Sequence, residues 1–291
     1  MNYNFFTSEF AKKSRFHWDF MRNVEKLENW EELSKNYDSF EKGNNLKSNE
    51  TIKIPKIIHQ IWIGPRKFPK KYLDWAKSWQ ELNPKWEYKL WTECDIKKLT
   101  LTNRDLYNRS TNYGFKSDLA RYEILSKYGG IYIDTDFECL SPIPEKFLNY
   151  DFVSCIVFSN EPQINNAIMM SKIDSKVINK TISKIEFLNE LKEPIDTIKS
   201  SGAINLTKQY FSLSQKEKEK FLILSSNYFY PFPNFLINRK KNIYDFITQE
   251  TIGIHHWEMS WMKGKNIKSI IKKLIKKGSE FFIKNKNLQS Q

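Results

Sequence analysis

One segment constrains the fold of this 291-residue chain more than any other, the run SDLARYEILSKYGGIYIDTD at residues 117–136. Leu119, Tyr122 and Leu125 recur at every third position, which is typical of the apolar face of a helix. A Gly-Gly pair predicts the end of that helix, and an apolar strand follows directly. A helix that leads straight into a buried strand is typical of α/β folds with parallel strands.

A second strand–helix–strand pattern lies upstream. The run KIPKIIHQIWIG at residues 53–64 is apolar and ends in Gly-Pro, which predicts a buried strand followed by a loop. Residues 72–82 predict a helix that Asn-Pro ends, and WEYKLW at 86–91 alternates like a half-buried strand. These three elements predict a βαβ unit, and therefore parallel strands joined by a right-handed crossover.

The second half of the chain has weaker patterns. The run DFVSCIVF at residues 151–158 predicts another buried strand. Residues 176–193 predict a helix that Pro194 ends, and NYFYPFPNF at 227–235 predicts an aromatic loop.

We divide the chain into three parts: a helical N-terminal extension at 1–50, an α/β domain at 51–265 and a basic amphipathic tail at 266–291. The extension ends at EKGNNLKSNE, whose composition is typical of a turn or linker. Its predicted helix face consists of Phe16, Phe20, Val24 and Leu27. Isoleucine and leucine on one face of the tail, with lysine around the other, are typical of a helix that lies in a membrane interface.

Charge and cysteine content narrow the classes of function. The 47 Lys and Arg against 34 Asp and Glu give a net charge of +13, which predicts attraction to polyanions, although base bias in the genome can produce the same excess. Three cysteines without a C-x-x-C pair indicate neither a disulfide framework nor a zinc site. We find no signal peptide and no run of about 18 apolar residues. We therefore expect a cytoplasmic protein, either soluble or peripheral on the inner face of the cytoplasmic membrane.

Two aspartates end the strand of the opening segment. Asp134 and Asp136 are one residue apart, so on an ideal strand their side chains leave the same face and repel each other. A hard divalent cation such as Mn²⁺ or Mg²⁺ relieves this repulsion and bridges carboxylates to substrate phosphates. Ligands of open α/β sheets bind at the carboxyl ends of the strands, where this pair is expected. The alternative is a solvated turn, in which Asp is common.

The same residues carry a resemblance to a known family. The run SDLARYEILSKYGGIYIDTDFECLSPI at 117–143, with IPKIIHQIWIG and WEYKLW upstream, resembles glycosyltransferase family 32, the DXD-containing sugar transferases that include mannosyltransferases, capsule and lipooligosaccharide transferases and, more distantly, glucosylating toxins. The resemblance covers residues 53–145 well and 200–262 loosely. It implies a GT-A-like fold, a Rossmann-like mixed sheet flanked by helices, which uses a nucleotide-sugar and Mn²⁺ or Mg²⁺.

Position by position, the resemblance implies roles for five residues. Asp136 resembles the aspartate that binds the metal directly, and Asp134 the one that reaches the ribose and, through water, the metal. Asp118 and Arg121 match the helix residues that contact the donor sugar and its phosphates, and Trp62 matches a position near the nucleotide base. A guanidinium suits a diphosphate, because it donates two parallel hydrogen bonds. An ordinary surface salt bridge for the helix pair and a core position for Trp62 are the alternatives.

The segment GIHHWEMSW near the C-terminus is the second concentration of candidate residues. His255, His256 and Ser260 are candidates for a further metal or diphosphate ligand, and Trp257 or Trp261 for a cover over the site. The family has a comparable stretch there, and we favour His256 with Ser260 as metal ligands and Trp261 on the nucleotide-sugar. A purely structural cluster is the alternative.

A weaker match is the run Ser200-Ser201-Gly202-Ala203. It lies where many family members have a Thr-Gly-Pro-like loop under the donor sugar, and Ala203 replaces the proline. The resemblance therefore assigns Gly202 to the donor site. A plain helix-start turn explains the same four residues.

The resemblance also implies the reaction. We expect a metal-dependent hexosyltransferase that moves a sugar, from a UDP-sugar in preference, to a hydroxyl of a glycan acceptor with retention of configuration. The basic surface and tail favour a lipid-linked glycan in bacterial surface polysaccharide or lipooligosaccharide synthesis and contact with an anionic membrane.

Other classes of function stay open. One is a protein-modifying effector, as in the toxin branch. A non-enzymatic nucleic-acid-binding protein is another, but no helix-turn-helix, zinc-finger or RNP-like signature is present, so we expect no nucleic-acid partner. A hydrolase or phosphotransferase that uses the same aspartates ranks lower, because no P-loop or kinase motif is present, as does an inactive scaffold, because the motif residues are intact.

Overall fold

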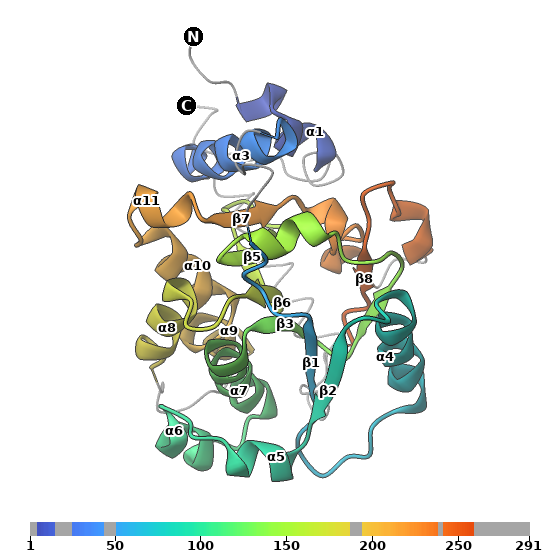
Figure 1. The fold of residues 1–291 in the computed structure, drawn as a ribbon, viewed down its shortest axis with the longest axis vertical. Helices are drawn as coiled ribbons and strands as arrows, with labels where there is room; N and C mark the ends of the chain where they lie inside the picture. The colour runs from blue at the N-terminus through green and yellow to red at the C-terminus, as the bar shows by residue number, and fades with distance from the viewer. Residues whose placement is uncertain (1–4, 15–24, 44–50, 187–193, 238–240, 259–291) are drawn as a thin grey trace, which may run out of the picture.

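The computed structural model describes residues 5–14, 25–43, 51–186, 194–237 and 241–258. Its centre is a six-stranded sheet with strand order β2-β1-β3-β6-β5-β7 (Figure 1). In chain order, the strands are β1 (Ile57–Ile61), β2 (Glu87–Trp91), β3 (Gly130–Ile133), β5 (Phe152–Ile156), β6 (Ile164–Ser171) and β7 (Phe221–Leu224).

The sheet is mixed. Strand β1 pairs in parallel with both β2 and β3, and β5 pairs in parallel with β7. Strand β6 lies antiparallel between β3 and β5. Two short strands, β4 (Phe137–Cys139) and β8 (Gly253–His255), form a separate antiparallel pair beyond the end of β3.

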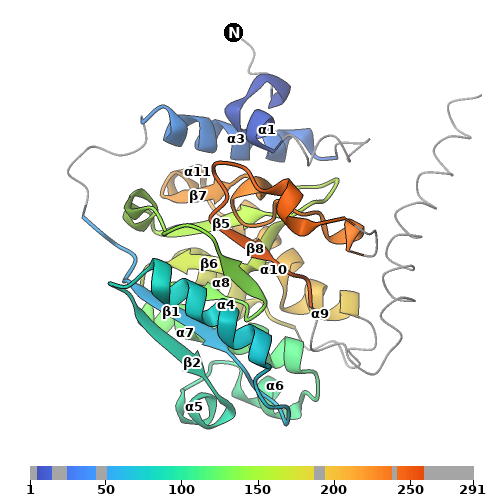
Figure 2. The ribbon, with the colours of Figure 1, turned by 90° about the vertical axis from the view of Figure 1, so that its right-hand side faces the viewer.

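Helices cover the sheet, and two of them form a separate layer. The helices are α1 (Glu9–Lys13), α3 (Leu27–Glu41), α4 (Lys70–Leu82), α5 (Glu93–Lys98), α6 (Arg104–Arg109), α7 (Tyr113–Tyr128), α8 (Lys176–Ser183), α9 (Pro194–Ser200), α10 (Ala203–Phe211) and α11 (Gln215–Lys218). Helices α7 and α10 pack on β6, and α4 packs on β4. In Figure 2, α1 and α3 lie above the sheet, with α3 against the edge strand β7.

The N-terminal layer is fixed by buried contacts. Tyr37 of α3 and Tyr228 share a hydrogen bond of 2.9 Å between their hydroxyls. The ammonium of Lys218 lies 2.8 Å from the carboxylate of Glu32, and its side chain is only 8% exposed. These contacts join α3 to the segments that precede and follow β7. Among the described residues, no helix has both the length and the apolar run that crossing a bilayer requires.

The mixed sheet flanked by helices that we expected from the sequence is confirmed. The upstream pattern is β1, α4 and β2, with parallel strands, and the opening segment is α7 followed by β3. The predicted strand at 151–158 is β5, and 227–235 is a loop with two short 3-10 turns. The predicted helix face at residues 16–24 and the tail at 266–291 lie outside the described residues, and the division into three parts stays a prediction.

One predicted helix is wrong. Helix α8 ends at Ser183, and Pro194 begins α9 instead of ending a helix that started at 176. Proline suits the first turn of a helix because the amide hydrogen that it lacks has no partner there.

Candidate metal and donor site

Two glycines set the start of β3 and hence the position of the aspartates at its end. Gly129, which caps α7, has φ of 63°, and Gly130 has φ of 89°. A Cβ atom on Gly130 would lie 2.5 Å from the backbone oxygen of Ile57, so β3 approaches β1 more closely than any side chain allows. Positive φ and this close approach both require glycine.

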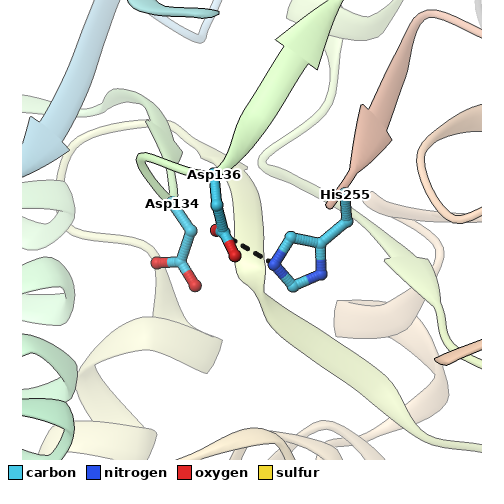
Figure 3. A group of neighbouring side chains, drawn as sticks. All are labelled: Asp134, Asp136 and His255. Carbon is cyan, nitrogen blue, oxygen red and sulfur yellow. Dashed lines mark hydrogen bonds and ion pairs between the residues drawn. The ribbon is translucent and has the colours of Figure 1, made fainter. Parts of the chain in front are cut away.

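Asp134, Asp136 and His255 form the core of the site (Figure 3). One ligand atom from each side chain lies within 4.8 Å of the others. Asp134 follows β3, Asp136 precedes β4, and His255 ends β8, so three strand ends converge. The pairing of β4 with β8 explains the long-range contact, because it places His255 opposite Phe137 with the two rings stacked at 4.5 Å.

Asp136 is held from several directions. Its Oδ1 lies 3.1 Å from Nε2 of His255, and its Oδ2 accepts a hydrogen bond of 2.8 Å from the backbone N–H of Glu258. Its backbone oxygen accepts another, of 2.9 Å, from the N–H of His256. Burial favours the neutral carboxyl, but the attraction of His255 and these hydrogen bonds outweigh it, so the pKa of Asp136 lies below its ordinary value.

Asp134 is held by a different set of residues. Its Oδ1 lies 3.2 Å from the guanidinium of Arg121 and accepts a hydrogen bond of 2.6 Å from the hydroxyl of Tyr132. The side-chain amide of Gln60 donates to its backbone oxygen at 3.2 Å. Burial raises the pKa of Asp134 above its ordinary value, because the attraction of Arg121 only partly opposes the loss of solvation and the charge of Asp136 adds to it.

The donor set of this cluster fits a divalent cation. Two carboxylates and one imidazole supply the oxygen and nitrogen ligands that Mn²⁺ accepts, and carboxylates alone suit Mg²⁺. The ring nitrogen Nδ1 of His255 is buried and has no hydrogen-bond partner in the part of the chain that the structure describes. The nitrogen that faces the aspartates is the other one, Nε2, which is the ring atom available to a cation beside Asp136.

Asp118 and Arg121 lie together on the inner face of α7. Each is 6% exposed, and Oδ1 of Asp118 lies 3.3 Å from the guanidinium, so the surface salt bridge that the sequence left open is excluded. Asp118 accepts hydrogen bonds from Ser201 at 2.7 Å and from Asn166 at 2.8 Å. Burial raises the pKa of Asp118 in spite of Arg121 and these donors. The pair therefore belongs to a buried polar network that reaches Asp134.

The sequence did not reveal four residues of this network. They are Asn166, Tyr132, Gln60 and the backbone N–H of Glu258. Asn166 lies in β6, a strand that we did not predict, and its backbone oxygen accepts from Arg121 at 2.8 Å. The guanidinium of Arg121 also lies 4.4 Å from the ring centroid of Tyr132. Tyr132 was visible only as an apolar strand residue, because nothing in its spacing marks a hydroxyl that points at Asp134.

The run 200–203 is the start of a helix and also contacts Asp118. Gly202 is the N-cap of α10 and Ala203 is its first residue. This agrees with the alternative explanation of these four residues, a turn that starts a helix. A Cβ atom on Gly202 would lie 2.9 Å from Cα of Ile198. Ser201 supplies the hydrogen bond to Asp118, so this turn is attached to the donor-side network. The role of Gly202 under the donor sugar stays a prediction.

Trp62 lies just beyond the carboxyl end of β1. It is partly buried, and its indole N–H donates to the backbone oxygen of Arg66 at 2.7 Å. Its ring packs edge to face against Phe68 and Tyr72, with centroids 5.4 and 5.5 Å apart. Its position near the base stays a prediction, and its partial burial is compatible with a ring that presents one surface to a ligand.

The structure brings His255 to the aspartates, and not His256, which we favoured from the sequence. His256 points away: its Nε2 lies 2.9 Å from Glu138, and its ring stacks on Trp75 at 4.1 Å. Neighbouring residues of a strand face opposite sides, so only one of the two histidines can face the pair. Trp257 packs beside His255 at 4.1 Å between ring centroids. Ser260 and Trp261 lie outside the described residues.

Comparisons with known proteins match the part of the chain that carries the two aspartates. Residues 69–153 match the family described as the glycosyltransferase sugar-binding region containing the DXD motif. Inositol phosphoceramide mannosyltransferase 3 of Schizosaccharomyces pombe is 38% identical over 96 residues, 32% of this chain and 27% of the relative. Subversion of eukaryotic traffic protein A of Legionella pneumophila is 24% identical over 242 residues, 73% of this chain and 35% of the relative.

The chain thus spans about a third of the length of these relatives. One solved structure, PaToxG Glycosyltransferase, aligns with a TM-score of 0.44 and 16% sequence identity. The alignment covers 64% of this chain and 80% of the chain in that structure. The matched family region contains Asp118, Arg121, Asp134 and Asp136. The family resemblance read from the sequence is therefore confirmed for residues 69–153, which match the model of the glycosyltransferase sugar-binding region containing the DXD motif.

Proposed function

We propose that this chain transfers a glycosyl group from a nucleotide-sugar to a hydroxyl of an acceptor, with Mn²⁺ or Mg²⁺ held by Asp134, Asp136 and His255. The observation that carries this proposal is the convergence of these three side chains within 4.8 Å, beside the buried Arg121, in the family region. A bound cation would neutralise the charge that develops on the leaving diphosphate.

The residues of the chain position the donor. Arg121 fixes the carboxylate of Asp134 and adds positive charge beside it, which favours an anionic diphosphate. Asp118 is oriented by Ser201 and Asn166 and is the candidate for hydrogen bonds to donor-sugar hydroxyls. Trp62 is the candidate for contact with the base. We propose retention of configuration, which the family resemblance implies and which requires no dedicated general base.

The nature of donor and acceptor is a finer part of the proposal. A UDP-sugar is the donor that the family resemblance favours, and the mannosyltransferase relative adds mannose to the candidate sugars. The name of that relative specifies a lipid acceptor, inositol phosphoceramide, which supports a lipid-linked glycan for this chain. We place the enzyme in bacterial surface polysaccharide or lipooligosaccharide synthesis, in the cytoplasm or peripheral on the inner membrane face.

A protein acceptor is the second candidate. It is the acceptor that the resemblance to the toxin branch implies, and the match to the Legionella protein, whose name describes subversion of eukaryotic traffic, covers 73% of this chain. Incubation with labelled donor and either lipid extract or host-cell protein separates the two acceptors, because label enters only the correct fraction.

The first experiment is a donor panel. Release of nucleoside diphosphate from UDP-, GDP- and dTDP-sugars, and of CMP from CMP-sugars, is measured with Mn²⁺, Mg²⁺ or chelator for the wild type and Asp136→Asn. We expect metal-dependent turnover of one donor that disappears in the variant. The proposal would be contradicted if the folded wild-type protein, in the presence of metal, neither turned over nor bound any nucleotide-sugar. Salt-sensitive nucleic-acid binding without Mn²⁺ would instead favour the non-enzymatic alternative.

A further inference from the structure

We infer that helix α4 holds in place residues 255–258, which complete the candidate cation site and which we call the closing segment. Trp75 of α4 is the residue that positions this segment. This inference rests on the cation site of the proposed function and adds a residue that touches neither cation nor substrate.

The closing segment supplies most of the contacts of Asp136. His255 lies at one carboxylate oxygen, the N–H of Glu258 donates to the other, and the N–H of His256 donates to the backbone oxygen. Asp136 can therefore keep its orientation only while the segment stays in register with it. A shift of the segment would move the imidazole of His255 away from both aspartates.

The local backbone of the segment does not favour this arrangement by itself. Trp257, its third residue, has φ of 54°, in the left-handed region that residues with a Cβ atom rarely adopt. Such a conformation costs about 1–3 kcal/mol and persists only where surrounding contacts impose it. The contacts that impose it therefore come from outside the segment.

Trp257 itself is held by its indole N–H, which donates to the backbone oxygen of Phe232 at 3.2 Å. Helix α4 holds the residues on either side of it, from two positions one turn apart. The ring of Trp75 stacks on that of His256 with centroids 4.1 Å apart and an interplanar angle of 12°. The ammonium of Lys71 lies 2.5 Å from the carboxylate of Glu258. Residues i and i+4 share a helix face, so α4 contacts the closing segment at two points along one face. Glu138 fixes the edge of the His256 ring through its 2.9 Å contact with Nε2.

The stacked pair is the stronger of the two contacts. Lys71 is 52% exposed, and exposed ion pairs contribute little because water and salt screen them. The His256 side chain is only 14% exposed, and Trp75 is supported on α4 by Tyr72, whose ring stacks on it at 5.3 Å. The helix itself is attached to β4 by the indole N–H of Trp79, which donates to the backbone oxygen of Phe137 at 3.0 Å. A rigid helix thus transmits its position to His256.

The test is Mn²⁺ binding to nucleotide-free protein, followed by electron paramagnetic resonance. Trp75→Ala is expected to weaken Mn²⁺ binding roughly tenfold or more, the effect typical of residues that orient metal ligands. Trp75→Phe keeps a ring for stacking and should stay within about threefold of wild type. Lys71→Ala should change affinity less than about twofold. Leu73→Ala, an exposed leucine on the same helix, is the matched control and should bind like wild type.

A second readout does not involve the metal. The amide hydrogen of Glu258 is bonded to Asp136, so its exchange with deuterium should accelerate roughly tenfold in Trp75→Ala while exchange within β3 stays unchanged. Unchanged Mn²⁺ affinity and unchanged Glu258 exchange in folded Trp75→Ala would overturn the inference, as would equal weakening in Leu73→Ala.

The outcomes separate this inference from the proposed function. Wild type that binds Mn²⁺ and responds to Trp75→Ala, but neither binds nor turns over any nucleotide-sugar, would support the positioning role and contradict only the sugar transfer. Metal-dependent turnover with a Trp75→Ala variant that binds Mn²⁺ normally would contradict only the positioning role.

Discussion

Nε2 of His255 lies 3.1 Å from Oδ1 of Asp136, although 119 residues separate them in the chain. On the other side of the aspartate pair, Arg121 lies 3.2 Å from Asp134. Each aspartate thus has a nitrogen partner of its own, from β8 and from α7 respectively. This arrangement explains how a buried carboxylate, Asp136, and a partly buried one, Asp134, can lie one residue apart in the chain. The ligand atoms of Asp134, Asp136 and His255 then lie within 4.8 Å of one another.

Replacing His255 by phenylalanine tests its place in this set. The ring contacts with Phe137 and Trp257 need only a flat side chain, so we expect His255→Phe to fold. Its melting temperature should be lower than that of wild type, because the buried carboxylate of Asp136 loses its nitrogen partner and keeps the N–H of Glu258. The nitrogen ligand is lost, and Mn²⁺ affinity should fall at least roughly tenfold in a resonance titration. Asp136→Asn is the comparison for loss of the site. A variant that binds Mn²⁺ like wild type would show that His255 lies beside the cation without binding it.

Removal of Arg121 should destabilise the protein severely. Its guanidinium lies within 3.3 Å of both Asp118 and Asp134, and Arg121→Met would leave the buried carboxylate of Asp118 and the partly buried one of Asp134 without their cation. Loss of one partner of a buried ion pair costs about 3–5 kcal/mol. We expect the free energy of unfolding, measured in urea at pH 7, to fall by this amount.

The matched control for Arg121 is an exposed ion pair. Lys77 and Glu81 pair at 3.2 Å on the surface of α4, with side chains 69% and 61% exposed. Lys77→Met should change the free energy of unfolding by less than about 0.5 kcal/mol. Equal effects of Lys77→Met and Arg121→Met would contradict the network described for α7.

The sequence predicted the elements that carry the aspartates, because local patterns define them. Helix α7, strand β3 and the βαβ unit follow from apolar spacing and from glycine or proline at their ends. Strand β6 was not predicted, since its polar residues, Asn165 and Asn166, interrupt the apolar run. Pro194 was misread because proline both follows helices and begins them, and sequence spacing alone does not distinguish the two.

The choice between His255 and His256 shows where sequence reasoning about the site ends. Both histidines lie in the same motif, and only the register of β8 against β4 decides which faces Asp136. Register between strands more than 100 residues apart depends on packing of the whole domain, including the contact of α4 with His256. The long-range partners of the aspartates therefore required the structure.

A buried histidine away from the site predicts a pH dependence of stability. His59 is 1% exposed; one of its ring nitrogens lies 2.9 Å from the backbone oxygen of Gly129, and the other accepts from the indole of Trp91 at 3.2 Å. Burial lowers the pKa of His59 to about 4 from its ordinary 6.5. Between these values the unfolded chain binds a proton that the folded protein excludes, so the stabilisation is complete above pH 6.5 and is lost as the pH falls toward 4.

The size of this effect is measurable. Between pH 7 and pH 4, the shift of His59 accounts for a loss of about 3 kcal/mol in the free energy of unfolding. His59→Gln should be less stable than wild type at pH 7, because it loses one buried hydrogen bond, but its stability should fall less between the two pH values. Urea unfolding at both pH values checks this. Parallel pH profiles for wild type and variant would contradict the assignment.

Proline at position 203 should be tolerated, although this chain has alanine there. Ala203 is the first residue of α10, a position that suits the fixed φ of proline, and Gly202 before it is extended, as the residue before proline prefers. Proline reduces the conformational entropy of the unfolded chain, so the free energy of unfolding of Ala203→Pro, measured by thermal unfolding, should rise by about 0.4–1 kcal/mol. Lys208→Pro, at an exposed position inside the same helix, should cost about 3 kcal/mol. If Ala203→Pro instead destabilises the protein as Lys208→Pro does, the alanine is required by packing at this turn, and the departure from the Thr-Gly-Pro-like pattern marks a different loop structure beneath Asp118.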